Sequence, residues 1–210
     1  MRLTAVFETW HLGDGNYPPL SKGQLVNLSF EIQPRSLRSS SSSKPGKLEQ
    51  IKDADYHFVG TILKIYDDSP RGKLVVIQAG DFRFYVDSFP PEIPPFKEGD
   101  GCEGDGPLLL DHYIWVEFLS SYPDPPDLFY PLRVTRIRSI KIPDEFISRN
   151  EKATSGPASL SPENYSAASI SEIDEMGIDE DWRFYLVDFD DSNIGSVTIP
   201  RTFRSHSQRV

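Results

Sequence analysis

The sequence has little cysteine and no long apolar run. Cys102 is its single cysteine among 210 residues, so no disulfide can form within the chain and no zinc site can be built from several thiolates. The first residues lack the apolar core of a signal peptide. No apolar run approaches the roughly 20 residues that a membrane span requires. These absences predict a soluble cytoplasmic protein without a membrane partner.

Catalytic and cofactor-binding motifs are missing as well. The chain contains no G-x-S-x-G, no H-E-x-x-H, and no glycine loop followed by Lys-Ser or Lys-Thr. We therefore expect no catalytic residue, no cofactor and no resident metal ion. An enzyme would require Asp53, His57, Asp111 or His112 to meet in a cleft, because adjacent residues of a strand point to opposite faces.

One loop has some of the chemistry of a cation site. Residues 98–106 place four carboxylates among four glycines, and Ca²⁺ prefers closely spaced oxygen ligands. The spacing departs from the D-x-D-x-D-G pattern and lacks its final glutamate. A tight acidic turn, in which glycine supplies the positive φ, accounts for the same residues. We therefore expect an acidic turn here, with Ca²⁺ binding as the alternative.

Composition favours many short strands. The chain has 18 prolines and 12% aromatic residues, which suit strands and loops better than long helices. The formal net charge is −10 and the pI is about 4.9. An acidic chain repels nucleic acids and anionic membranes on average, so non-specific binding to either is disfavoured.

Alternation of apolar and polar residues predicts a mainly β fold. In residues 24–32, for example, Val26, Leu28, Phe30 and Ile32 form one apolar face. Strands are expected over residues 2–10, 24–32, 57–66, 73–78, 82–87, 108–119, 129–142 and 182–188, and the first two are expected to form an N-terminal hairpin.

Residues 56–142 resemble the OB-fold in their succession of strands and turns. A long first strand with a glycine kink (Val59-Gly60-Thr61) leads to a hairpin at 73–87, and a Gly-Asp turn (Lys97-Glu98-Gly99-Asp100) precedes the later strands. The resemblance implies a small barrel, closed by the strand at 129–142. An SH3-like barrel or a sandwich fits the same spacing. OB-folds often bind single-stranded nucleic acids or sugars, which is a fold-level analogy only.

The predicted organisation has three parts. Residues 1–143 form a barrel-like domain with a flexible serine-rich loop at 36–46, residues 144–170 form a linker, and residues 171–210 form an acidic α/β extension that packs on the barrel. The serine-rich loop is read as an inert connection, with phosphorylation or docking as its alternative.

The acidic extension predicts the function. Acids flanking aromatic residues suit docking onto a basic protein surface through charge steering and aromatic anchors. The commoner use of such residues is a solvated acidic loop before a strand whose aromatics fill the core. We expect a non-catalytic interaction protein, for instance an inhibitor or immunity-type protein. The expected partner-binding residues are Glu172, Asp174, Glu175, Asp179, Glu180 and Trp182.

The alternative function is single-stranded nucleic-acid binding on the open face of an OB-fold. This function requires basic and aromatic side chains that converge on one groove. The candidate residues are Lys64, Tyr66, Arg83, Tyr85, Arg136, Arg138 and Lys141. The competing explanation is that these side chains only solvate the outer strands.

Overall fold

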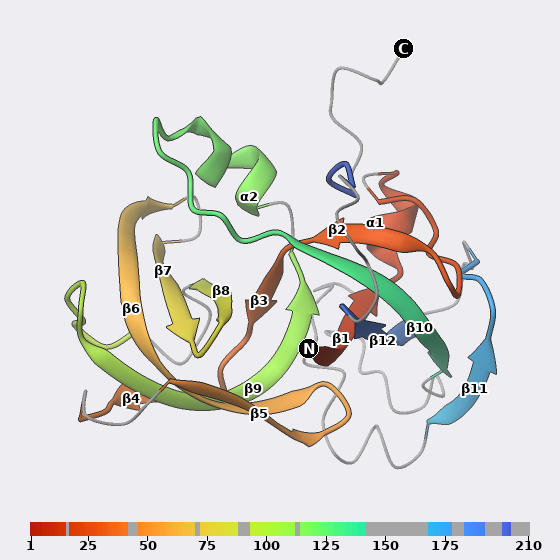
Figure 1. The fold of residues 1–210 in the computed structure, drawn as a ribbon, viewed down its shortest axis with the longest axis horizontal. Helices are drawn as coiled ribbons and strands as arrows, with labels where there is room; N and C mark the ends of the chain where they lie inside the picture. Colours follow the sequence, from red (N-terminus) through yellow and green to blue (C-terminus); the bar gives the residue numbers. More distant parts are fainter. Residues whose placement is uncertain are drawn as a thin grey trace, which may run out of the picture.

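The computed structural model describes residues 1–15, 17–41, 46–69, 72–87, 93–111, 114–141, 168–177, 183–191 and 199–202. Within these residues, twelve strands form one mixed sheet with only short helical segments beside it (Figure 1). The predicted mainly β fold is therefore confirmed. Among the described residues, no helix is both long enough and apolar enough to cross a membrane.

The first group of strands contains the hairpin predicted at 73–87. β6, β7 and β8 follow one another as antiparallel neighbours, and Gly80 closes the β7–β8 turn with a φ of 64°. A positive φ is the reason that this turn uses glycine. The bounds are β5 (Lys47–Lys52), β6 (Asp55–Ser69), β7 (Gly72–Ala79) and β8 (Phe82–Asp87), with β5 paired to β6.

β9 (Gly101–Leu110) connects β6 with the N-terminal part of the chain. Its residues 101–107 pair with β6, and its residues 108–110 pair with β3 (Phe30–Ile32). β3 in turn runs parallel to β8, with Glu31 opposite Tyr85. Each of the strands β3, β8, β7, β6 and β9 thus has two neighbours within this set. The short β4 (Ser36–Ser39) also pairs with β9.

The second group of strands combines both ends of the described chain. β12 (Arg183–Asp190) lies between β1 (Arg2–Glu8) and β10 (Tyr130–Lys141), antiparallel to both. β11 (Ser169–Ile173) and β2 (Leu25–Leu28) also pair with β10. β1 meets β9 through a short parallel pairing at Val6 and Leu109. The C-terminal residues therefore supply integral strands of the sheet.

Several expected elements differ from the observed ones. The N-terminal hairpin does not form, because β1 pairs with β12 and β9, while Ser29 separates β2 from β3. The predicted closing strand, β10, pairs with β2, β11 and β12 instead of with β6–β9. The predicted strand at 108–119 ends at Leu110, and Ser36–Ser39 of the predicted loop is a strand. Residues 42–45 and most of the predicted linker lie outside the described residues.

One apolar core joins the two groups of strands. It contains the predicted apolar face Val26, Leu28, Phe30 and Ile32 together with residues from β1, β6–β10 and β12. Phe30 contacts Phe82 of β8 and Phe189 of β12, with ring centroids 5.8 and 5.9 Å apart. Aromatic pairs at such distances stabilise a core beyond the area they bury. β3 therefore packs against strands of both groups.

Candidate functional site

A short segment covers the face of β6, β7 and β8 that points away from the main core. Residues 114–129, named here the covering segment, contain α2 (Ile114–Glu117) and the 3-10 helix η1 (Leu119–Ser121). Figure 1 shows them above the upper ends of β6 and β7. The strands contribute Tyr66, Leu74, Val76 and Tyr85 to the interface, and the covering segment contributes Ile114, Trp115, Leu119 and Leu128.

The outside of the covering segment is acidic and aromatic. It carries Glu117, Asp124 and Asp127 and no lysine or arginine. All three acids are exposed, and Phe118 and Tyr122 beside them are half-buried. The Tyr122 hydroxyl donates to Asp68 Oδ1 at 2.6 Å, which raises the pKa of Tyr122 to about 12. Burial raises the pKa of Tyr66, and the negative charge of Asp124 adds to this shift.

A cation from the far end of the chain lies on this segment. The Arg201 guanidinium carbon is 3.9 Å from the centroid of the Trp115 ring and 4.6 Å from that of Phe129. The two rings meet edge to face at 4.9 Å, and Trp115 Nε1 donates to the Pro126 carbonyl at 3.0 Å. Such a position over ring faces is favourable for a cation because of the ring quadrupole.

A buried polar cluster lies beneath the covering segment. The Tyr85 hydroxyl oxygen is 2.7 Å from Glu31 Oε2 and 2.6 Å from Asp111 Oδ1. Ser29 Oγ donates to Asp111 Oδ2 at 2.8 Å, and the backbone N–H of Trp115 donates to the same oxygen at 3.3 Å. All these side chains are less than 5% exposed. Asp111 thus ties the start of α2 to β3 and β8.

The Tyr85 hydroxyl joins the two carboxyl groups of this cluster. Burial raises the pKa of Tyr85 well above its ordinary value, and the neighbouring carboxylates act in the same direction. The cluster is named here the internal clasp, because it connects β3, β8 and the start of α2.

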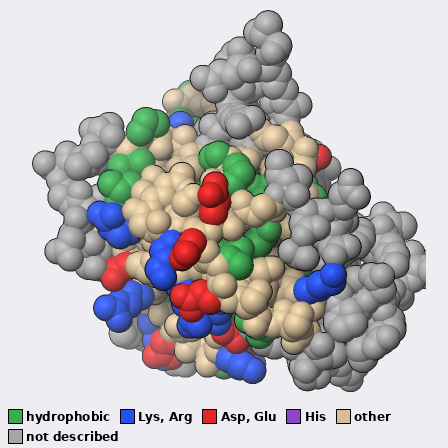
Figure 2. All heavy atoms as spheres, turned by 90° about the vertical axis from the view of Figure 1, so that its right-hand side faces the viewer, with side chains coloured by type: hydrophobic (Ala, Val, Ile, Leu, Met, Phe, Trp, Pro, Cys, Tyr) green, Lys and Arg blue, Asp and Glu red, His purple; other side chains and the backbone are tan. Residues whose placement is uncertain are grey.

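The predicted acidic surface is partly neutralised where the structure describes it. Glu172 lies 2.8 Å from Arg136 Nε and 3.5 Å from Lys22 Nζ, and Asp174 lies 3.9 Å from the same lysine. The Arg136 contact lowers the pKa of Glu172. Glu175 forms a β-bridge with Ser21. Figure 2 shows acidic and basic side chains intermixed on this side. Asp179, Glu180 and Trp182 lie outside the described residues.

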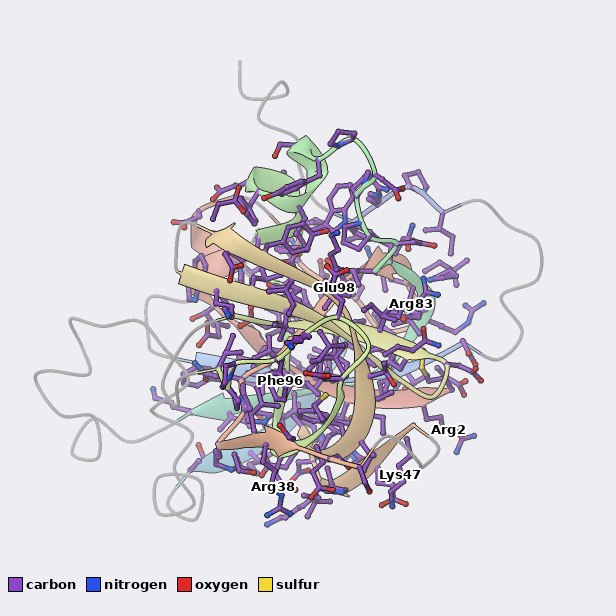
Figure 3. All side chains as sticks on the ribbon, turned by 90° about the vertical axis from the view of Figure 1, so that its left-hand side faces the viewer. Arg2, Arg38, Lys47, Arg83, Phe96 and Glu98 are labelled. Atoms are coloured by element: carbon purple, nitrogen blue, oxygen red, sulfur yellow. The ribbon has the colours of Figure 1, made fainter. Side chains whose placement is uncertain are left out.

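The predicted nucleic-acid residues do not share one groove within the described residues. Lys64 pairs with Glu98 at 3.2 Å, Arg136 pairs with Glu172, and Arg138 bridges Asp53 and Asp188 at 2.7 and 2.9 Å. Tyr66 and Tyr85 are buried, so neither ring offers an open stacking face. Lys141 is exposed at the end of β10. Arg83 is exposed on β8, where its backbone contacts the Tyr130 hydroxyl, and Figure 3 shows it well above Arg38 and Lys47 in that view.

The loop at 98–106 is largely strand β9, and its carboxylates already have partners. Glu103 pairs with Arg38 at 2.7 Å, and Asp105 pairs with His57 at 2.8 Å. The described residues contain no group of three or more side chains suited to hold a metal ion. Cys102 is fully buried, and burial raises its pKa to about 12, which suppresses the reactive thiolate.

The residues that an enzyme was expected to bring together have separate partners. Asp53 binds Arg138, His57 binds Asp105, and Asp111 binds Tyr85 and Ser29. His112 lies outside the described residues.

The covering segment is a candidate site that the predicted elements do not include. Ile114, Trp115, Phe118 and Leu119 are spaced as the apolar stripe of a helix, at positions i, i+1, i+4 and i+5. That spacing was a usable signal against the strand predicted at 108–119. No protein family, curated protein or solved structure matches the chain.

Proposed function

We propose that this chain is a non-catalytic protein that binds a basic protein partner through an acidic surface. The observation that carries the proposal is the outer side of the covering segment. Glu117, Asp124 and Asp127 form no ion pair with any described residue, and the half-buried rings of Phe118 and Tyr122 lie on the same segment. Unpaired acids attract a basic partner from a distance, and aromatic rings supply apolar contact area on docking.

The covering segment supports this function better than residues 172–182 do. Lys22 and Arg136 already offset the charges of Glu172 and Asp174, whereas no lysine or arginine occurs in residues 114–129. Exposed ion pairs contribute little attraction for an incoming charge. Glu172, Asp174 and Glu175 stay in the proposal as secondary contributors.

We further propose that β6, β7, β8, β9 and β3 form an OB-like barrel in which β3 is the closing strand. The proposal is supported by the circuit of pairings among these strands. An SH3-like arrangement is the alternative. Single-stranded nucleic-acid binding is the second candidate function, and this circuit is the observation in its favour. The covering segment lies over one face of β6–β8, which weighs against it.

A capture experiment tests the proposed function. The tagged chain is incubated with host extract, with and without nuclease, and bound proteins are identified by mass spectrometry. We expect a stoichiometric basic protein that survives nuclease and is released by moderate salt.

Two sets of charge-reversal variants are compared: one in the covering segment, and one at residues 172–175 as its matched control. Glu117→Lys, Asp124→Lys and Asp127→Lys together should abolish capture, while Glu172→Lys, Asp174→Lys and Glu175→Lys together should weaken it less. Capture that depends on nucleic acid, or that is indifferent to both sets, contradicts the proposal.

A further inference from the structure

The tail of the described chain is hydrogen-bonded to β2 at Asn27. Residues 199–202 are named here the strap. The Thr202 backbone N–H donates to the Asn27 carbonyl at 2.9 Å, and the Asn27 N–H donates to Thr202 Oγ1 at 2.8 Å. Asn27 Nδ2 also donates to the Ile199 carbonyl at 3.0 Å. Both main-chain groups of Asn27 thus point away from β10, where Pro131 stands opposite.

The strap places an arginine on the covering segment at the same time. Arg201 is exposed, forms no ion pair with a described residue, and lies over the Trp115 and Phe129 rings. The covering segment that it contacts also carries Glu117, Asp124 and Asp127. The strap therefore has two features of a bound peptide: hydrogen bonds that join it to one residue of a strand, and one side chain held in a specific site.

We infer that the β2 edge and the Trp115–Phe129 ring pair form a docking site for an arginine-bearing segment of the basic partner, and that the strap fills this site in the partner's absence. The inference rests on the proposed function for the basic character of the partner. The strap occupies the site in place of the partner segment, so its residues indicate the chemistry that the partner segment must have.

The geometry defines what the occupant must contain. A guanidinium suits the site better than an ammonium, because its planar group stacks on aromatic rings and is weakly hydrated. The next residue should be Thr or Ser, because its hydroxyl accepts the Asn27 N–H. The residue three positions before this Thr or Ser should present its carbonyl to Asn27 Nδ2, as Ile199 does. A sequence such as Ile-Pro-Arg-Thr meets these conditions, and the strap has this sequence.

The strap can be displaced because its contacts are few. An exposed cation over a ring and a few hydrogen bonds to one residue are each weak in water. The strap competes well only because it is tethered, which gives it an effective concentration on the order of millimolar. A partner that also contacts the acidic covering segment gains binding free energy that the strap lacks, and it can therefore displace the strap.

The test uses the full chain and a synthetic peptide, Thr-Ile-Pro-Arg-Thr-Phe, which copies residues 198–203. Peptide binding is measured by fluorescence anisotropy for the wild type and for the full-length double variant Arg201→Gln, Thr202→Val. We expect the double variant to bind the peptide about tenfold more tightly than the wild type, because the tethered competitor is weakened. A peptide with Ala in place of Arg should bind about tenfold more weakly.

A second measurement requires no variant. Saturating peptide should replace the strap in the wild type, so hydrogen exchange at the Thr202 amide should accelerate while the Asn27 amide stays protected. This readout keeps the inference testable if the double variant fails to fold, which circular dichroism reveals.

Several outcomes overturn the inference. They are a folded double variant that gains no peptide binding, equal binding of the Ala peptide, or a concentration-dependent dimer in which the strap of a second copy occupies the site. If capture of a basic protein still depends on Glu117, Asp124 and Asp127 while the peptide does not bind, the docking site is wrong and the proposed function stands. If the peptide binds but no basic protein is captured, the docking site stands and the proposed function is wrong.

Discussion

The hydroxyl oxygen of Tyr85 lies 2.6 Å from Oδ1 of Asp111, and this contact joins β8 to the residue that follows β9. Because Asp111 also accepts from the backbone N–H of Trp115, the same carboxyl group anchors the covering segment. The internal clasp therefore positions the surface that we propose to bind a partner, although none of its side chains is exposed.

Removing this hydroxyl should destabilise the fold. In Tyr85→Phe, Glu31 and Asp111 lose a shared buried partner, and we expect the free energy of unfolding to fall by about 1–3 kcal/mol. Urea unfolding followed by tryptophan fluorescence measures the loss. Tyr122→Phe is the matched control, because its hydroxyl bonds to Asp68 at the surface, and it should change stability little. Equal effects of the two variants would contradict the assigned role of the clasp.

Stability should decline at alkaline pH. Burial raises the pKa of Tyr56 to about 12 and that of Tyr85 well above its ordinary value. The folded state therefore retains these protons when the unfolded chain, with tyrosine pKa values of about 10, has lost them. The stabilisation is complete below about pH 10 and is lost as the pH rises toward 12. Urea unfolding at intervals from pH 8 upward tests this, and Tyr56→Phe should flatten the decline. A free energy of unfolding that stays constant up to pH 11 would refute this prediction.

Arg138 should matter far more than its neighbour Arg136. Arg138 lies between Asp53 and Asp188 with only 14% of its side chain exposed. Arg138→Ala leaves two partly buried carboxylates without their cation, and we expect a loss of about 2–3 kcal/mol, less than for a fully buried pair. Arg136 pairs with Glu172 at the surface, so Arg136→Ala should have little effect. Thermal unfolding of both variants measures the difference in stability. Similar melting temperatures would contradict the prediction.

Gly104 should not tolerate a side chain. A Cβ there would lie 2.3 Å from the Ser36 carbonyl oxygen and 2.7 Å from Phe58 Cζ. The backbone of β4 and a core ring cannot both move away without cost, so Gly104→Ala should destabilise by about 2 kcal/mol or more. Gly13→Ala is the control, because nothing lies within 4 Å of a Cβ at that position. Chemical denaturation measures both, and a neutral Gly104→Ala would mean that β4 does not pack as described.

The sequence predicts those elements whose formation depends on nearby residues. The β7–β8 hairpin is correct because Gly80 supplies the positive φ of the turn and apolar runs flank it. The glycines of residues 98–106 were read as turn-forming, whereas Gly104 and Gly106 allow the backbone near β4 to approach β9 closely. The sequence does not distinguish a glycine that allows close backbone approach from a glycine that forms a turn.

The failures concern partners that are distant in the chain. Residues 24–32 have one continuous apolar face, yet Ser29 bonds to Asp111 and the two halves join different strands. Tyr85 is predicted to lie on the open face of an OB-fold, but it is buried. Both faces of β8 are buried, since residues 114–129 cover the second one. The candidate site could not be located before this covering was known.

The position of β12 also determines the order in which the protein can fold during synthesis. β12 lies between β1 and β10, and residues 2–8 of β1 have seven register partners in it. Until residue 190 has left the ribosome, β1 has only its short contact with β9, and β10 lacks its central neighbour. The circuit of β3 and β6–β9 is complete once residue 110 has emerged. We therefore expect a nascent chain in which this circuit forms first and β1 stays without its main partner until residues 183–190 have emerged.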